Sequence, residues 1–281
     1  MKKYYCFAGV GVEIDIPDQW MYENDRHLAP FRVDAVADPY VFRFEIVSQL
    51  LPPACEYLAG NGALRVYSDG TRYIGTVDKS WEQAHAQVIV NGQQHRVLLK
   101  HSQFPNRLGT HSVLNVLCAE HLIAQAGGFV FHSSYIEVDG KAILFTAPSE
   151  TGKSTQADLW HRLRGAPIHN GDRSAVRWQD GRAYACGIPF AGSSPICENV
   201  TLPLAAIVYL RQAPQTTIRR LRGAESFRRV WEGCSVNTWD RSDVDLVSET
   251  VTCVLSDVPV FELACTPDES AILALEGVLR T

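Results

Sequence analysis

The sequence predicts a mixed α/β (α+β) fold organised in two regions. Residues 1–105 carry strand patterns and turn signals, residues 109–125 carry the broad apolar stripe of a helix, and the rest of the chain alternates apolar runs with helical spacing. A chain of 281 residues can bury one large core or two modest ones. We therefore divide the chain into a β-rich N-terminal region, 1–105, and a second domain, 106–281, of mixed sheet and helices.

The N-terminal region is predicted to form strands joined by tight turns. Residues 40–47 alternate large apolar side chains with polar ones, which is the period of a half-buried strand. Asp-Gly at 69–70 and Asn-Gly at 91–92 each separate two apolar runs, so we expect two hairpins in an antiparallel meander. The opening stretch, 5–16, predicts one further strand.

The second region is organised around residues 147–155, Ala-Pro-Ser-Glu-Thr-Gly-Lys-Ser-Thr. They fit the phosphate-loop pattern of Gly or Ala, four residues, then Gly-Lys-Ser/Thr, in which backbone N–H groups and a helix N-terminus surround a phosphate that the Lys neutralises. The apolar run 142–145 predicts a buried strand before the loop, and residues 152–164 have helical spacing before Gly165. This order indicates a nucleotide-phosphate site; a chance match on an unrelated turn is the alternative. The candidate cofactor-binding residues are Ser149, Glu150, Thr151, Gly152, Lys153, Ser154 and Thr155.

Segments downstream of the loop are expected to complete its core. After the extended residues 167–170, the acid Asp172 follows a short turn and can lie across from the phosphate loop. Apolar runs at 204–210 and 258–264 predict core strands. Thr-Pro-Asp-Glu at 266–269 supplies a helix N-cap and a Pro at the first helical position, so a final helix is expected there.

Composition and charge disfavour several classes of function. A net charge of −5 and the lack of a basic block disfavour nucleic acid and a membrane surface as partners. The eight cysteines form no Cys-x-x-Cys pair and the nine histidines no His-Glu-x-x-His spacing, so free thiols are expected. The apolar run after Lys2 and Lys3 is too brief for a signal peptide, and no run reaches transmembrane length. A cytoplasmic protein with access to ATP is the consistent expectation, and association with copies of itself stays open.

The order of four motifs resembles a known family. His132 heads a strand hairpin, the phosphate loop ends at Thr155, Asn-Gly-Asp-Arg follows at 170–173, and Gly-Ile-Pro-Phe stands at 187–190. Together they resemble the catalytic domain of HPr serine kinase/phosphorylase and its relatives, which share a phosphoenolpyruvate carboxykinase-like nucleotide-binding core. The resemblance covers roughly residues 129–270. It implies an ATP-dependent kinase that uses Mg²⁺ and transfers the γ-phosphoryl group to a hydroxyl, with Ser or Thr of a peptide or small protein as the favoured acceptor.

The resemblance also implies roles for Asp172, His132 and Lys153 as catalytic residues. Lys153 would offset charge on the β and γ oxygens, Ser154 and Asp172 would hold Mg²⁺, and His132 would lie near the transferring phosphate. Each has a simpler alternative. Asp172 could cap a turn, Ser154 could be an ordinary residue of the first helical turn, and His132 could be a hydrogen-bonded imidazole in the core.

Two departures from the family pattern leave the activity open. Gly171 stands where relatives place an acid suited to accept the proton of the attacking hydroxyl, and Glu150 stands where many phosphate loops have a glycine. His169, Glu150 or a base brought by the substrate could replace the missing acid. The alternative function is a nucleotide-binding regulatory or scaffolding protein with weak or no catalysis. A carboxykinase-type lyase is disfavoured because no second cluster of metal ligands is found. The N-terminal region is expected to present the acceptor or a partner.

Overall fold

A computed structural model describes residues 2–15, 27–60, 64–69, 73–77, 84–101, 118–190 and 196–279. The chain divides into two compact units, Met1–Ala119 and Glu120–Thr281, and each is described by itself. The boundary expected near residue 105 lies outside the described residues and stays a prediction. Most of the helix expected at 109–125 also lies outside them, and the structure describes its end as α2 (Ala119–Gln125).

The first unit contains one sheet with the strand order β3-β1-β2-β4-β9-β8-β7-β6-β5 among its described residues. Its elements are β1 (Lys2–Phe7), β2 (Val10–Asp15), the short 3-10 helix η2 (Ala29–Phe31), β3 (Arg32–Val33), β4 (Tyr40–Val47), β5 (Glu56–Gly60), β6 (Leu64–Ser68), β7 (Tyr73–Val77), β8 (Ala86–Asn91) and β9 (Gln94–Lys100). Strands β5 to β9 form the expected antiparallel meander, whereas β4 pairs in parallel with β2 and β9.

Three predictions for this unit can be compared with the structure. The hairpin at 91–92 is confirmed, because Asn91 pairs with Gln94 across the β8–β9 turn. The turn of the hairpin expected at 69–70 lies partly outside the described residues, although β6 and β7 pair as expected. The single strand expected at 5–16 is wrong. Positive φ angles of 47° at Ala8 and 75° at Gly9 reverse the chain there and make two antiparallel strands, β1 and β2.

The second unit is a mixed sheet flanked by helices. Its strands are β10 (Gly128–Val138), β11 (Lys141–Thr146), β12 (Ile168–Asn170), β13 (Arg173–Gln179), β14 (Arg182–Cys186), β15 (Thr201–Gln212), β16 (Thr217–Leu221), β17 (Cys234–Ser235) and β18 (Val260–Cys265). Its other helices are α3 (Lys153–Arg164), α4 (Gly223–Trp231), α5 (Arg241–Asp257) and α6 (Glu269–Leu279). The strand order is β11-β10-β13-β14-β15-β18-β16, with β12 and β17 paired to β10. The expected mixed α/β architecture is therefore present.

Three strands of this sheet, β11, β15 and β18, run parallel to one another. β15 pairs in parallel with β11 on one side and with β18 on the other, so their carboxyl ends lie at the same edge. The β11–β15 pairing also closes a ring, β11-β10-β13-β14-β15, within the sheet. The strand of the phosphate loop, β11, thus has a neighbour on both sides.

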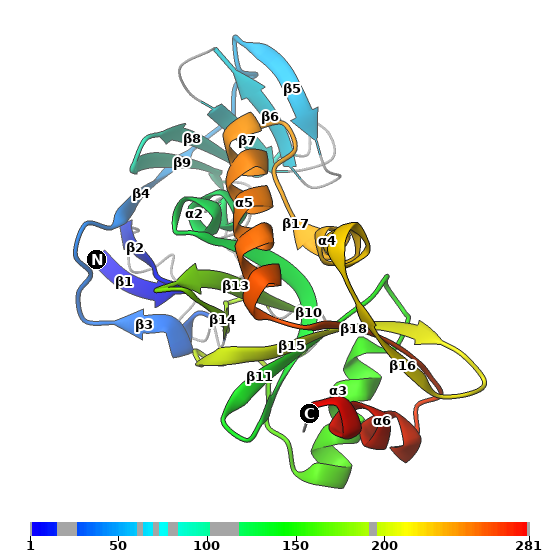
Figure 1. Ribbon diagram of the computed structural model, residues 1–281. Helices are drawn as coiled ribbons and strands as arrows, with labels where there is room; N and C mark the ends of the chain where they lie inside the picture. Colours follow the sequence, from blue (N-terminus) through cyan, green and yellow to red (C-terminus); the bar gives the residue numbers. More distant parts are fainter. Residues whose placement is uncertain are drawn as a thin grey trace. The chain divides into compact units, whose positions relative to one another are not determined.

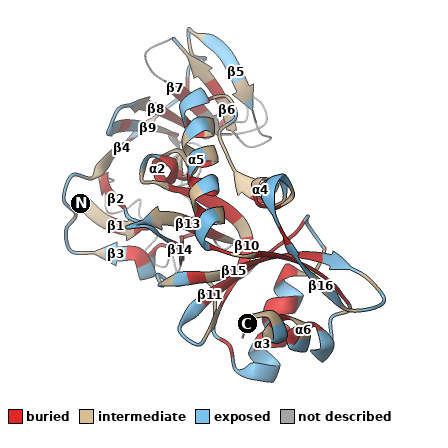
Figure 2. Ribbon diagram, in the orientation of Figure 1, coloured by how far each residue is buried: buried red, intermediate tan, exposed pale blue. Residues whose placement is uncertain are grey.

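Helices cover both faces of this sheet (Figure 1). On one face, Trp160 of α3 and Ile272 of α6 share a buried apolar cluster with Phe145. On the other, Val251 of α5 belongs to a second cluster with Phe129. Figure 2 shows the central strands as largely buried. Among the helices of the described segments, none is long and apolar enough to cross a membrane.

Candidate functional site

The phosphate loop joins the buried end of β11 to the start of α3. Gly152, which precedes the helix, has a φ of 112°, a conformation that L side chains rarely adopt. Glu150 has a φ of 64°, which costs a non-glycine residue about 1 kcal/mol. No side chain at the N-cap occupies the first N–H groups of α3, because that residue is a glycine. Such a helix N-terminus suits an anion.

Lys153, the first residue of α3, is buried at the base of the loop. Its side chain is folded back on the loop, where Nζ donates to the carbonyl oxygens of Ala147 at 3.0 Å and Pro148 at 3.3 Å. Burial lowers the pKa of Lys153, and the negative charge of Asp172 acts in the opposite direction. The loop therefore holds a cation where the pattern requires one.

Asp172 occupies a turn that is built by a buried side chain, Asn170. Oδ1 of Asn170 accepts hydrogen bonds from the backbone N–H groups of Asp172 and Arg173, each at 3.0 Å. Nδ2 of Asn170 donates to the carbonyl oxygens of Ile188 at 3.2 Å and Phe190 at 3.0 Å. One amide thus fixes the turn and ties it to the neighbouring loop.

The carboxylate of Asp172 contacts His132 of β10. Oδ1 of Asp172 lies 3.1 Å from Nε2 of His132, and Oδ2 lies 3.7 Å from Nε of Arg173. The hydrogen bond with His132 is the main cause that lowers the pKa of Asp172, and the charges of Arg173 and Lys153 add to it. The side chain of His132 is 32% exposed, so it is not the core imidazole that the simpler alternative supposed.

The first turn of α3 contacts the Asp172 turn directly. Oγ of Ser154 donates to the carbonyl oxygen of Gly171 at 3.4 Å, and Oγ of Ser134 donates to the same oxygen at 3.0 Å. With the electrostatic interaction between Lys153 and Asp172, these contacts bring the predicted catalytic and metal-binding residues together at the carboxyl end of β11.

A cavity of about 560 Å³ lies beside the loop. Its walls are residues 210–214 at the end of β15, residues 265–267 after β18, and four of the predicted cofactor-binding residues, Glu150, Thr151, Gly152 and Thr155. Ser149 is exposed. Open α/β sheets bind ligands outside the carboxyl ends of parallel strands, and the volume suits a small molecule.

His169, a candidate to replace the missing acid, is engaged elsewhere. Its Nδ1 lies 2.7 Å from Glu198 and its Nε2 lies 2.9 Å from Glu137. The ring is buried and packs edge-on against Tyr135 at 5.0 Å between centroids. Because both nitrogens already have carboxylate partners, the structure disfavours His169 as a base at Asp172. Glu150 is exposed on the loop and stays open as an alternative.

Three residues that shape the site were not assigned a role from the sequence. The sequence showed Asn170 only as the first residue of the Asn-Gly-Asp-Arg motif at 170–173. A Cβ on Gly187 would lie 1.8 Å from the carbonyl oxygen of Glu198, and one on Gly233 would lie 2.5 Å from the ring of Phe131. The Gly-x-Pro-aromatic spacing is a signal for Gly187. Gly233, whose carbonyl accepts the N–H of His132 at 2.8 Å, has no such signal.

A second group of charged side chains lies between α2 and the start of α5. Nδ1 of His121 is 2.8 Å from Oδ1 of Asp243, and Asn237 donates to the other oxygen at 3.0 Å. Asp240 caps α5 by accepting from the N–H groups of Ser242 and Asp243. Burial is the largest single effect on His121 and lowers its pKa, but the hydrogen bond with Asp243 and the negative charges of Asp243 and Asp240 together outweigh burial, so the pKa is raised. These bonds account for the group as a structural link between two helices.

Comparisons with known proteins show no family for this chain. A scan against protein-family models and a search of curated proteins found no match. Among solved structures, the chain is similar to the Hpr(Ser) kinase/phosphatase from Coxiella burnetii, with 11% sequence identity and a TM-score of 0.31. The match covers 54% of this chain and 93% of that chain. These values indicate a distant structural relationship only, so a function has to be argued from the site.

Proposed function

We propose that the second unit binds Mg-ATP at the phosphate loop and transfers the γ-phosphoryl group to a hydroxyl, with Ser or Thr of a peptide or small protein as the acceptor. The observation that carries the proposal is the contact between the first turn of α3 and the Asp172 turn. It sets a lysine, a serine hydroxyl and a carboxylate beside a helix N-terminus that has no side-chain cap. Phosphoryl transfer depends mainly on such positioning and charge stabilisation.

The donor set fits the metal and the nucleotide. Mg²⁺ prefers hard oxygen ligands, and the hydroxyl oxygen of Ser154 and the carboxylate of Asp172 are the ligands proposed to hold it. The lowered pKa of Asp172 keeps this carboxylate ionised, as a metal ligand must be. The cavity lined by Glu150 and Thr155 is the proposed place for the nucleoside. Bound Mg-ATP would supply the transferred phosphoryl group.

Each residue of the site has a separate part in this scheme. When ATP binds, Lys153 gives up its hydrogen bonds to the two loop carbonyls and donates to the phosphate oxygens. Its positive charge then offsets the negative charge of the phosphates. Asp172 holds His132 by one hydrogen bond, and His132 is proposed to contact the transferred phosphoryl group. Asn170 keeps the Asp172 turn in place.

A substitution of the lysine tests the proposal. Lys153→Ala removes a charge-assisted contact and is expected to weaken Mg-ATP binding by about 1.5 to 3 kcal/mol. Isothermal titration calorimetry measures this change, with Arg162→Ala, an exposed position in the last turn of the same helix, as the matched control. Unchanged affinity in a folded Lys153→Ala protein would rule out the loop as the site.

A second candidate, a nucleotide-binding regulatory protein with weak or no catalysis, is favoured by Gly171 and by the engagement of His169. Both schemes predict Mg-ATP binding, but only the first predicts transfer. Single-turnover consumption of ATP with a Ser-containing acceptor peptide separates them. In the kinase scheme, Asp172→Asn loses Mg-dependent transfer and Arg162→Ala retains it. Wild-type protein that binds Mg-ATP without any turnover would favour the regulatory scheme.

A further inference from the structure

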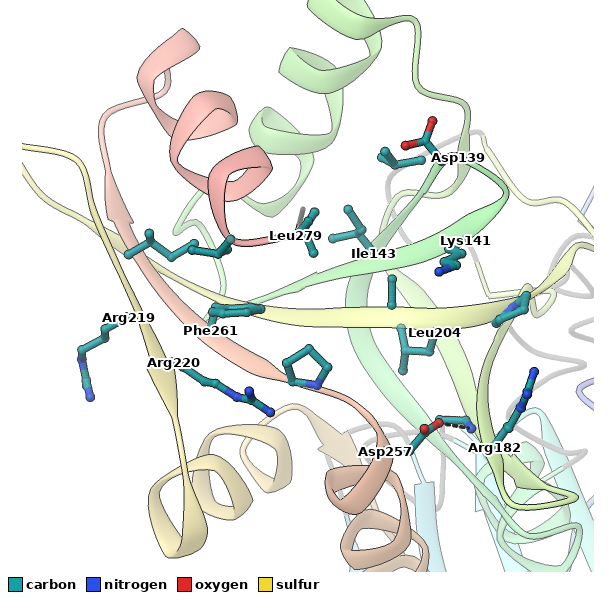
Figure 3. A pocket seen from close by; sticks show the side chains of 17 residues that line it. Asp139, Lys141, Ile143, Arg182, Leu204, Arg219, Arg220, Asp257, Phe261 and Leu279 are labelled. Atoms are coloured by element: carbon teal, nitrogen blue, oxygen red, sulfur yellow. Dashed lines mark hydrogen bonds between the residues drawn. The ribbon is translucent and has the colours of Figure 1, made fainter. Parts of the chain in front are cut away.

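A cavity of about 910 Å³ lies near the starts of β11, β15 and β18, away from the phosphate loop (Figure 3). The charged side chains at this cavity balance one another. The bases and, in equal number, the acids beside them are Lys141, Arg182, Arg219 and Arg220, and Asp139, Asp257, Glu225 and Glu262. The cavity therefore selects no charged ligand. A basic side chain with unused hydrogen-bond donors lies instead at the candidate nucleotide site, on the first residue of β13.

That residue is Arg173, whose side chain donates no hydrogen bond to any other residue in the described part of the chain. Its guanidinium lies between two acids, with Nε 3.7 Å from Oδ2 of Asp172 and Nη1 4.0 Å from Oε1 of Glu120 on α2. Both distances exceed the usual range of an N–H···O hydrogen bond, about 2.7 to 3.2 Å. A guanidinium carries more N–H donors than any other side chain. The charges attract one another, but the donors remain available to a ligand that presents several oxygens.

The side chain of Arg173 lies beside that of His132 on one face of the sheet. The two residues are direct partners in the antiparallel ladder of β10 and β13, and such partners project to the same side. The carboxylate of Asp172 contacts both, with Oδ1 3.1 Å from Nε2 of His132 and Oδ2 3.7 Å from Nε of Arg173. A charge interaction links the same carboxylate to Lys153. Arg173 thus belongs to the group of side chains around the proposed Mg-ATP site.

Exposure and packing suit this guanidinium to a contact with a ligand. The side chains of His132 and Asp172 are 32% and 27% exposed, and that of Arg173 is 34% exposed, so all three reach solvent. Cζ of Arg173 lies over the ring of Phe190, 5.8 Å from its centroid, and a cation is attracted to an aromatic face. The carbonyl of Phe190 is in turn bonded to Asn170, which holds the Asp172 turn. The guanidinium is therefore held in place before a ligand arrives, as a group that stabilises a transition state must be.

We propose that Arg173 is a catalytic residue whose guanidinium donates hydrogen bonds to the oxygens of the transferring γ-phosphoryl group. The inference rests on the proposed function. In that reaction the bond between the γ phosphorus and the bridging oxygen breaks and its electron pair stays on ADP, while the acceptor hydroxyl oxygen bonds to phosphorus and its proton goes to a base or to water. Charge spreads over the phosphoryl oxygens in the transition state, and a planar guanidinium matches two of them. Arg173 is therefore expected to act on the rate, and Lys153 on nucleotide binding.

Arg173→Ala in the full chain tests the inference. Single-turnover transfer from saturating Mg-ATP to a Ser-containing peptide is expected to slow about 10²- to 10³-fold, and calorimetry is expected to show Mg-ATP affinity changed by less than about threefold. Mg-ADP with aluminium fluoride, a mimic of the transition state, is expected to bind the variant about tenfold or more weakly. Arg173→Lys keeps the charge beside both acids but not the planar fork, so it should fold normally and recover only part of the rate. Arg182→Ala, an exposed arginine on β14, is the matched control and should retain the full rate.

A purely structural role of Arg173 predicts different results. If Arg173 only offsets the charge of Glu120, the loss of rate should disappear in the Glu120→Gln background, and if it only fixes Asp172, the loss should disappear at saturating Mg²⁺. Either result would overturn the inference, as would full rate in Arg173→Lys or equal weakening of Mg-ATP and of the transition-state mimic. Wild-type protein that does not bind Mg-ATP would refute the proposed function together with this inference. Wild-type protein that transfers phosphate no faster than Arg173→Ala would refute this inference alone.

Discussion

Asn170→Ala should destabilise the second unit and disturb the Asp172 turn at the same time. The side chain of Asn170 is fully buried and makes four hydrogen bonds, two to backbone N–H groups and two to backbone carbonyls. At a net contribution of about 1 kcal/mol each, their loss amounts to about 4 kcal/mol. Asp172 and Arg173 are only half-buried, so water can form hydrogen bonds with their N–H groups in the variant and recover part of the lost free energy. We therefore expect a decrease of about 2 to 4 kcal/mol in the free energy of unfolding.

Urea unfolding followed by tryptophan fluorescence measures this change, with Gln179→Ala, an exposed amide on β13, as the control. Asn170→Asp separates the two halves of the bonding pattern. It keeps an acceptor for the N–H groups of Asp172 and Arg173 but turns a second oxygen toward the carbonyls of Ile188 and Phe190, so it should lose stability while retaining the turn. A loss below about 1 kcal/mol for Asn170→Ala would refute the argument that this amide holds the turn.

Two further predictions concern the candidate site and the effect of pH on stability. If transfer lacks a base, Gly171→Asp should leave Mg-ATP affinity nearly unchanged and raise single-turnover transfer by up to about 10² to 10⁴-fold, and an unchanged rate would show that another group already accepts the proton. The raised pKa of His121 means that its pairing with Asp243 stabilises the fold fully below the unfolded histidine pKa, near 6.5, and that this contribution is lost as pH rises through the folded value. The stability difference between wild type and His121→Gln, measured by urea unfolding, should therefore shrink as pH rises, and a difference that grows with pH would contradict the assignment.

The strand and helix around the phosphate loop were predictable because their signals are local. The apolar run 142–145 lies within β11, and Gly165, with a φ of 69°, ends α3 where the helical spacing stops. The contacts of Asn170 were not predictable, because its carbonyl partners stand 18 and 20 residues further along the chain. No sequence pattern fixes which distant carbonyls a buried amide will reach.

Two other features depended on the tertiary structure. The chain reverses at Ala8 and Gly9, but apolar residues continue on both sides of this turn. The sequence pattern therefore predicted a single strand where the structure has two, β1 and β2. His169 lies in the extended run 167–170, three residues before Asp172, and it was one of the candidates to replace the missing acid. Its ring instead contacts Glu137 and Glu198, which lie 32 and 29 residues away. Neighbouring positions on a strand point to opposite faces, and the sequence does not show which face meets the site.

The closed ring of strands determines where the phosphate loop can move. β11 cannot leave the sheet without breaking its ladders to β10 and β15 together, so it has no free edge from which to fray or to exchange with another molecule. Amide hydrogens of β11 should consequently exchange with deuterium only when the whole unit opens. At its other end the loop runs into α3, which Trp160 anchors in the core. Any movement of the loop is therefore confined to residues 148–152, which lie between two fixed supports.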